Sequence, residues 1–277
     1  MKEINIDEKL AGQKMMRCLE RYLSNAPKSF LYKMLRKKNI TLNNSKATGD
    51  EKLKCGDTIK IFFSDETFEK FAADNNRTAN DDYYSRIYRP LDIIYENSDV
   101  IFINKPSGML SQKAKPEDVS LVEYLIAHLI HKGELNAGDL ASFKPGICNR
   151  LDRNTSGIVA AGKTTKGLQQ LSEAFKQRIL GKYYLCIVKG NVDKRALIKG
   201  YLYKDNKTNK VTISRTETKD SLPIETEYIP VCSNGNVTLL KIHLLTGRSH
   251  QIRAHLASIG HPLIGDYKYG SQSVNDA

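Results

Sequence analysis

The chain of 277 residues is long enough for one large domain or two unequal domains, and its hydrophobic content of 40% is sufficient for a folded core. Its formal net charge of +12 favours an anionic partner, nucleic acid before membrane. Because the sequence has no apolar run of about 18 residues and its N-terminus is charged, we expect a soluble cytoplasmic protein without a membrane span or signal peptide.

Residues 1–64 are predicted to form a small basic module. Apolar residues recur at helical spacing in 14–23 and 30–35, and short strands with a turn at Asn43-Asn44 follow. The cationic side chains that would face RNA phosphates are Arg17, Arg21, Lys28, Lys33, Arg36, Lys37 and Lys38. A charge run is usually a solvated surface. However, the order of elements, with the Asn-rich turn and the ending Leu-x-x-Gly-Asp-x-Ile, resembles the RNA-binding domain named after ribosomal protein small-subunit four, which implies RNA binding.

Residues 65–86 are predicted to be a linker. The stretch 74–82 lacks apolar periodicity and is rich in turn formers. We therefore expect it to be mobile between two folded units, the second of which spans 87–277.

The second domain opens with two apolar runs of strand length, at 91–96 and 99–105. Pro106 and Gly108 then break the strand, because proline removes a ladder donor and glycine permits unusual backbone angles. A lysine at such a corner, here Lys105, usually faces solvent. Residues 121–130 are predicted to form an amphipathic helix.

The stretch 146–163 is predicted to be a strand, a polar turn and a buried strand. Its carboxylate, Asp152, lies between Arg150 and Arg153 in the sequence. A cation within about 4–6 Å typically lowers an Asp pKa by about 1–3 units, so we expect Asp152 to be ionised at neutral pH. An ionised Asp in a fixed turn can act as a nucleophile or base. On the local pattern alone, the alternative is an Asx-turn residue with surface arginines.

A helix is expected after this stretch, and a β-prone strand follows at 182–188. Alternation along that strand places Tyr183 and Tyr184 on opposite faces, so only one of them can face a cleft. Antiparallel hairpins are predicted between about residues 196 and 245.

The segment 246–255 turns from a strand into a helix with Ile252 on its apolar face. His250 and His255 are five positions apart, which is not the spacing of a helical zinc pair. The five cysteines are an odd number and widely spread, so they indicate neither a disulfide framework nor a zinc site. We therefore predict no metal site.

Three stretches of the second domain carry a resemblance. They are Asn149-Arg-Leu-Asp-Arg-Asn-Thr-Ser-Gly157, Lys182-Tyr-Tyr184 and Thr246-Gly-Arg-Ser-His-Gln-Ile-Arg-Ala-His255, extended by 261–266 and 269–270. These motifs resemble those of the RluA-like family of RNA pseudouridine synthases, of the large-subunit ribosomal RNA type. The resemblance implies an α+β fold, with a mixed, largely antiparallel sheet and flanking helices. It also implies isomerisation of uridine to pseudouridine without metal, ATP or redox cofactor. One departure is Asn149, where the family more often has His.

The resemblance also implies roles for single residues. Asp152 matches the essential carboxylate, Tyr184 matches the tyrosine that stacks on the base, and Arg253 matches the ion-pair partner of the carboxylate. Tyr183 is then the packing residue. Further substrate contacts are predicted for Lys105, Arg150, Arg248, His250 and Ile252. Arg150 is expected on the same strand face as Asp152, where it would fill the gap left by a flipped base.

Alternatives stay open for the substrate and for activity itself. The basic N-terminal module favours large-subunit (23S) ribosomal RNA over tRNA. A non-catalytic RNA-binding protein of ribosome assembly is disfavoured because Asp152, Tyr184 and Arg253 are intact, and a hydrolase is disfavoured because no second carboxylate motif is present. We expect a monomer. The chain stops at Ala277, before the further strand that the resemblance implies, which indicates a truncated chain or a short variant.

Overall fold

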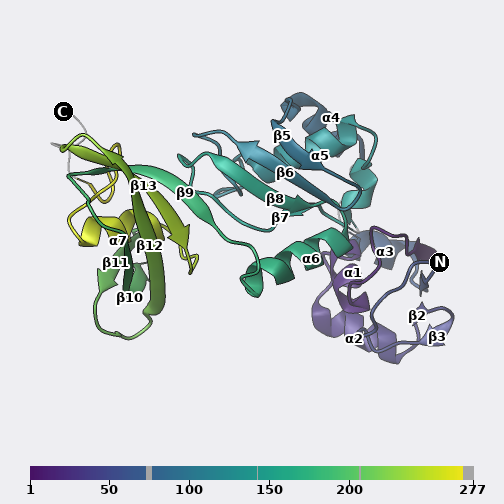
Figure 1. Ribbon diagram of the computed structural model, residues 1–277. Coiled ribbons are helices and arrows are strands. Elements are labelled where there is room, and N and C mark those ends of the chain that lie inside the picture. Colours follow the sequence, from purple (N-terminus) through teal and green to yellow (C-terminus); the bar gives the residue numbers. More distant parts are fainter. Residues whose placement is uncertain (73–76, 142, 206, 271–277) are drawn as a thin grey trace. The chain divides into compact units, whose positions relative to one another are not determined.

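The computed structural model describes residues 1–72, 77–141, 143–205 and 207–270 (Figure 1). The chain divides into two compact units, Met1–Lys176 and Gln177–Ala277. Their boundary falls inside the predicted 87–277 domain, so the division into 1–64, 65–86 and 87–277 stays a prediction about function. The sequence predicts a truncated chain or a short variant that stops at Ala277. The last residues before this end, 271–277, lie outside the described residues.

Residues 1–64 form a pair of helices against a small antiparallel sheet. The helices α1 (Met15–Tyr22) and α2 (Lys28–Arg36) confirm the predicted helices, and each buries its apolar stripe. The sheet has the order β1 (Lys2–Asn5), β4 (Thr58–Ile61), β2 (Ile40–Leu42), β3 (Ser45–Lys46). Asn43 and Asn44 have φ of 50° and 61°, as a two-residue type I′ hairpin turn requires. Sequence patterning does not predict β1, because Ile4 is its one buried residue.

The predicted linker is largely helical. Ser64 accepts a hydrogen bond from the Thr67 N–H at the start of α3 (Asp65–Phe71), and α4 (Arg77–Ile87) follows. A serine cap and an acidic first turn favour α3, which explains why this part of the stretch is not irregular. Residues 73–76, on which part of the expected mobility rests, lie outside the described residues.

The N-terminal module packs on the later part of the first unit. The Thr165 hydroxyl donates to the Lys9 carbonyl at 2.7 Å, and the Gln169 amide donates to the Gly12 carbonyl at 2.9 Å. Phe143 and Leu168 join the apolar cluster built by α1 and α2. The module and α6 (Thr165–Lys176) therefore share one core.

A second antiparallel sheet in the first unit has the order β5 (Ile93–Glu96), β6 (Val100–Lys105), β8 (Gly157–Gly162), β7 (Gly146–Ile147). α6 packs against β8, and α4 packs against α5 (Leu121–His131) (Figure 1). Ser120 and Glu123 form a capping box that begins α5. A short 3₁₀ helix, η1 (Ala137–Ala141), follows. This sheet carries the loop with Asp152 between β7 and β8.

The second unit is an antiparallel sheet with α7 (Gln251–Ser258) on one face (Figure 1). The strand order is β11 (Lys210–Ser214), β10 (Ala196–Asp205), β12 (Leu222–Ser233), β13 (Val237–Leu244), β9 (Tyr183–Lys189). Leu240, Ile242 and Leu256 form the core between sheet and helix. The predicted hairpins are confirmed.

Candidate active site

Asp152 lies in an irregular loop between two strands. β7 ends at Ile147 and β8 begins at Gly157, so the predicted order of strand, turn and strand is confirmed. The expected shared strand face of Arg150 and Asp152 is wrong, because neither residue lies in a strand. The Arg150 side chain is exposed, whereas Asp152 is half-buried.

A turn after β6 holds this loop in place. Lys105 is fully buried, and its Nζ donates to the carbonyls of Met109 at 2.9 Å, Pro106 at 3.0 Å and Arg153 at 3.2 Å. The Gly108 N–H donates to the same Arg153 carbonyl at 2.8 Å, and Arg153 Nε donates to the Gly108 carbonyl at 3.1 Å. Lys105 thus departs from the solvent-facing position that is usual for a lysine at such a corner, because backbone carbonyls converge on its ammonium.

The charge of Lys105 interacts with that of Asp152. Burial lowers the pKa of Lys105, and the attraction of the Asp152 carboxylate opposes this shift. The lysine predicted to shape the cleft is thus an internal support of the Asp152 loop, close enough to Asp152 for their charges to interact.

Ser111 and Asn149 fix the loop further. The buried Ser111 hydroxyl donates to the Leu151 carbonyl at 2.7 Å and accepts from the Leu151 N–H at 3.0 Å. Asn149 donates to the Ile158 carbonyl at 3.1 Å and accepts from the Ala160 N–H at 2.8 Å. The residue before Asp152 is therefore fixed through both of its backbone polar groups, and sequence reasoning gave no role to Ser111.

Tyr184 and Ile252 pack on the same side of the second unit. Both side chains are partly buried against the core between β13 and α7. Tyr183 was expected to be the packing residue, which is wrong, because 59% of it is exposed and its ring stacks on His243 with centroids 4.7 Å apart. The helix α7 covers the face of β9 to which Tyr184, not Tyr183, belongs.

Arg253 on α7 makes a bidentate ion pair with Asp266. Arg253 Nε lies 2.7 Å from Asp266 Oδ2, and its Nη2 lies 2.8 Å from Oδ1. Burial alone would raise the pKa of Asp266, but hydrogen bonds from Arg253 and from the Lys268 N–H lower it. The expected pairing of Arg253 with Asp152 joins residues of different units and stays a prediction. Sequence reasoning missed Asp266 as a partner, and its place in the extension of the last motif was the available signal.

Gln251 and His255 attach α7 to the sheet. Gln251 Nε2 donates to the Glu225 carbonyl and to the Thr226 hydroxyl, each at 3.0 Å. The buried His255 Nδ1 lies 3.0 Å from the same hydroxyl. Burial lowers the pKa of His255 to about 4, so its imidazole is neutral at pH 7. These motif residues therefore hold the helix that presents Ile252 and Arg253.

A cationic cluster, made of Arg178, Lys182 and Arg248, lies in the second unit. Burial lowers the pKa of Lys182, and the charges of Arg178 and Arg248 lower it further. Within the part of the chain that the structure describes, none of the three forms an ion pair with a carboxylate. Such a cluster favours an anion. His250, the other predicted contact in this motif, places Nδ1 2.7 Å from the Tyr269 hydroxyl.

The cationic residues predicted in the N-terminal module lie at the surface. Those with exposed side chains are Arg17, Lys28, Lys33, Arg36, Lys37 and Lys38. Arg21 is half-buried, and burial followed by repulsion from Arg17 lowers its pKa. Lys28 pairs with Glu20 at 2.8 Å, so its charge is partly compensated.

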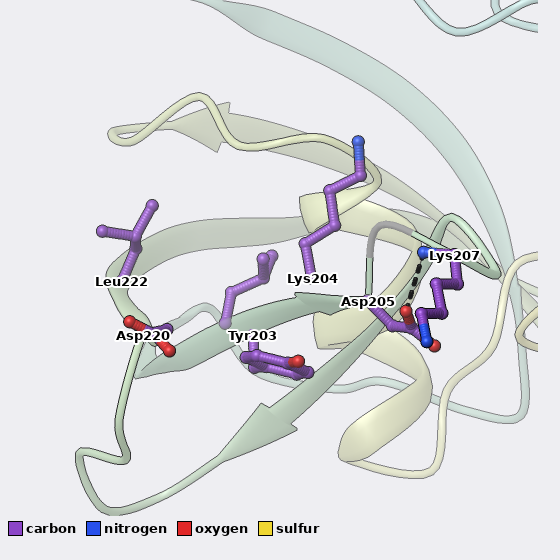
Figure 2. A pocket seen from close by; sticks show the side chains of 7 residues that line it. Tyr203, Lys204, Asp205, Lys207, Asp220 and Leu222 are labelled. Carbon is purple, nitrogen blue, oxygen red and sulfur yellow. Dashed lines mark hydrogen bonds between the residues drawn. The ribbon is translucent and has the colours of Figure 1, made fainter.

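A hollow of about 480 Å³ lies beside β10 in the second unit (Figure 2). Tyr203 and Leu222, which are 43% and 44% exposed, line it together with Lys204 and Lys207. Asp205 Oδ1 accepts the Lys207 N–H at 2.8 Å. Its lining includes none of the predicted catalytic residues, so this hollow does not mark the candidate site.

Among the described residues, no group of three or more His, Cys, Asp or Glu side chains is arranged to hold a metal ion. Within the same ranges, no helix combines the length and apolar character needed to cross a membrane.

Comparison with known proteins identifies a family model and several relatives that match this chain. A family model described as RNA pseudouridylate synthase matches residues 99–258. An uncharacterized RNA pseudouridine synthase of Mycoplasma pneumoniae is 32% identical over 255 residues, which cover 91% of this chain and 76% of that protein. A ribosomal large subunit pseudouridine synthase C of Vibrio cholerae is 28% identical, covering 97% and 80%, and a ribosomal large subunit pseudouridine synthase D of Borreliella burgdorferi is 31% identical, covering 91% and 75%.

Solved structures share the fold. Human RNA pseudouridylate synthase domain containing 1 has a TM-score of 0.54 at 22% identity, covering 68% of this chain and 72% of that chain. Human RNA pseudouridylate synthase domain containing 4 has the same TM-score at 19% identity, covering 72% and 74%. The predicted α+β fold of antiparallel sheets and flanking helices is confirmed.

Proposed function

The chain belongs to the RNA pseudouridylate synthase family and is an RNA pseudouridine synthase, and we propose that it isomerises uridines of large-subunit ribosomal RNA with Asp152 as the catalytic carboxylate. The relatives named for the large ribosomal subunit support this substrate, because the similarity covers nearly the whole chain. The matched region 99–258 contains Asp152, Tyr184 and Arg253.

The reaction exchanges one bond of the ribose for another. The bond from C1′ to N1 of uracil breaks, a bond from C1′ to C5 forms, C5 loses a proton and N1 gains one. Nothing is oxidised or reduced. The chemistry requires an anionic carboxylate in a fixed position, a surface that retains the detached base, and a group that removes the C5 proton.

The fixed loop around Asp152 is the observation that carries this proposal. Ser111 binds both backbone polar groups of Leu151, and Lys105 binds the Arg153 carbonyl, so both sequence neighbours of Asp152 are anchored. A carboxylate held on both sides loses little freedom when the substrate binds. Asp152 can therefore meet the uridine as nucleophile or base without reorganising its loop.

The other predicted residues support this carboxylate. In the proposal, Tyr184 stacks on the uracil and Ile252 lines its pocket, because both lie on the α7 side of β9. Arg253 stabilises the Asp152 carboxylate, while Asp266 holds the guanidinium in position. The exposed Arg150 fills the RNA stack when the uridine leaves it.

RNA phosphates are proposed to bind at the cationic residues outside the catalytic loop. The cluster of Arg178, Lys182 and Arg248, with His250 beside it in sequence, serves the second unit. The basic face of α1 and α2 serves residues 1–64, which we propose to be an RNA-binding domain of the small-subunit-four type. A cytoplasmic monomer is part of the proposal.

The test is release of tritium from RNA labelled at C5 of uridine, with 23S ribosomal RNA and tRNA transcripts as substrates. We expect the native chain to release tritium from the ribosomal transcript. Asp152→Asn removes the charge but keeps the shape, and should lower the rate at least about 10³-fold, since it removes the reacting group itself.

The alternatives give different results. Release from tRNA alone would make the chain a tRNA pseudouridine synthase. If both proteins fold and bind RNA but neither releases tritium, the chain is a non-catalytic RNA-binding protein.

A further inference from the structure

A second hollow, of about 460 Å³, lies next to the Asp152 loop in the first unit. One wall is the turn that clamps the loop, residues 106–110, together with Arg153, the neighbour of Asp152. The remaining lining comes from Arg89, Asp118, Val119 and Tyr124. The volume is in the range that holds one nucleotide-sized ligand.

The two arginines leave donors available in this hollow. The Arg89 guanidinium carbon lies 3.9 Å from the centroid of the Tyr124 ring, a contact that orients the group without using its N–H donors. Arg153 uses Nε for the Gly108 carbonyl. In the described ranges, neither arginine forms an ion pair with a carboxylate.

Asp118 only partly offsets this charge. Its Oδ2 accepts the N–H groups of Lys115 at 2.8 Å and Ala114 at 3.0 Å. These bonds tie the carboxylate to its own loop, and they lower its pKa, first through the Lys115 N–H. With two arginines against one aspartate, the lining carries excess positive charge.

We propose that this hollow, the Arg89 subsite, binds a backbone phosphate of the RNA next to the target uridine. Free guanidinium donors match the oxygens of a phosphate and bind them in pairs. The wall of the hollow is continuous with the loop that carries Asp152, so an RNA strand that reaches Asp152 passes it. The inference rests on the proposed function, because that function supplies the RNA.

The test compares Arg89→Met with Arg86→Met in the full chain. Methionine keeps an apolar contact with the Tyr124 ring and removes the guanidinium. Arg86 is the matched control, because it lies three positions before Arg89, near the end of α4, is exposed, and donates to the Asp82 carbonyl at 3.1 Å. The probe is a 23S ribosomal RNA transcript with sparsely and randomly ethylated phosphates, separated into protein-bound and unbound fractions.

We expect ethylation of one phosphate to weaken binding of the native chain and of Arg86→Met about ten-fold, the loss of a single charge-assisted contact. Arg89→Met should be insensitive to ethylation there, and should raise KM about ten-fold with kcat within about two-fold. If the same ethylated phosphates weaken binding of the native chain and of both variants, the subsite is overturned. An equal loss of RNA affinity in Arg89→Met and Arg86→Met would also overturn it. The ethylation readout needs RNA binding alone, unlike KM and kcat, so absence of tritium release would reject the proposed function and leave the ethylation result interpretable.

Discussion

Asp266 remains charged although only 5% of its side chain is exposed. Burial acts to raise its pKa, but the two hydrogen bonds from Arg253 and the N–H of Lys268 outweigh that effect. Arg253 therefore depends on Asp266 for its orientation, and the guanidinium carbon also lies 5.1 Å from the centroid of the Tyr269 ring. A residue outside the predicted catalytic set thus positions one inside it.

Asp266→Asn should lower the free energy of unfolding by about 2 kcal/mol at pH 7, because hydrogen bonds between charged groups are lost. The folded-state pKa of Asp266 lies below the unfolded value of about 3.9, so its stabilisation is fully present above that pH and is lost as pH falls through the folded value. Urea unfolding at pH 7 and pH 3 measures this, and the difference between native and variant should shrink at pH 3.

Asp50→Asn is the control for this change, because the Lys14–Asp50 pair is exposed, at 65% and 72% of the two side chains. Exposed pairs contribute little to stability, so we expect a much smaller effect than that of Asp266→Asn. A loss in Asp266→Asn that is equally large at both pH values would show that packing, not charge, is responsible.

At the scale of elements, the turn after β6 and the Asp152 loop behave as one part. Lys105, Gly108 and Ser111 each donate a hydrogen bond to the backbone carbonyl of Leu151 or Arg153. These anchors fix the backbone on both sides of Asp152, and so they fix where its side chain begins. The position of the carboxylate is therefore sensitive to small changes in this turn.

Ser111→Ala should lower kcat about ten-fold while the affinity for RNA stays within about two-fold. The substitution leaves the buried N–H and carbonyl of Leu151 without this partner, at a cost of about 1–3 kcal/mol, and loosens the loop. Single-turnover tritium release and RNA binding separate the two effects. Ser233→Ala is the control, since this exposed hydroxyl also donates to a backbone carbonyl, that of Val237, and water can replace it there. Equal losses in both variants would contradict the argument.

Local sequence patterns were sufficient to predict those helices and strands that bury one face along their length. The apolar spacing in α1 and α2 and the alternation in β9 predict those elements because each buries one face. Spacing could not predict which face of β9 is covered, since that depends on α7. It also could not predict the partners of Ser111 and Arg253, because these contacts join residues 40 and 13 positions apart.

At the scale of the whole molecule, the basic residues behind the net charge of +12 are concentrated in particular places. The C-terminal end of α2 places Arg36, Lys37 and Lys38 in succession, all exposed. The module that carries them is bonded to α6 through Thr165 and Gln169, so it belongs to the same compact unit as Asp152. If RNA binds this module as proposed, it is held in a fixed relation to the Asp152 loop.

Replacing Arg36, Lys37 and Lys38 by Gln should reduce the salt dependence of RNA binding. Each lost phosphate contact flattens the slope of log K against log salt by about 0.7 to 0.9, so the triple variant should lower the slope by about 2 to 3. The rate at saturating RNA should stay unchanged, because these side chains do not touch the Asp152 loop. The control replaces Lys204, Lys207 and Lys210 by Gln. These exposed residues lie in the second unit, and their replacement removes the same amount of charge. Equal flattening in both variants would show that net charge, not a phosphate-binding face on α2, governs the interaction.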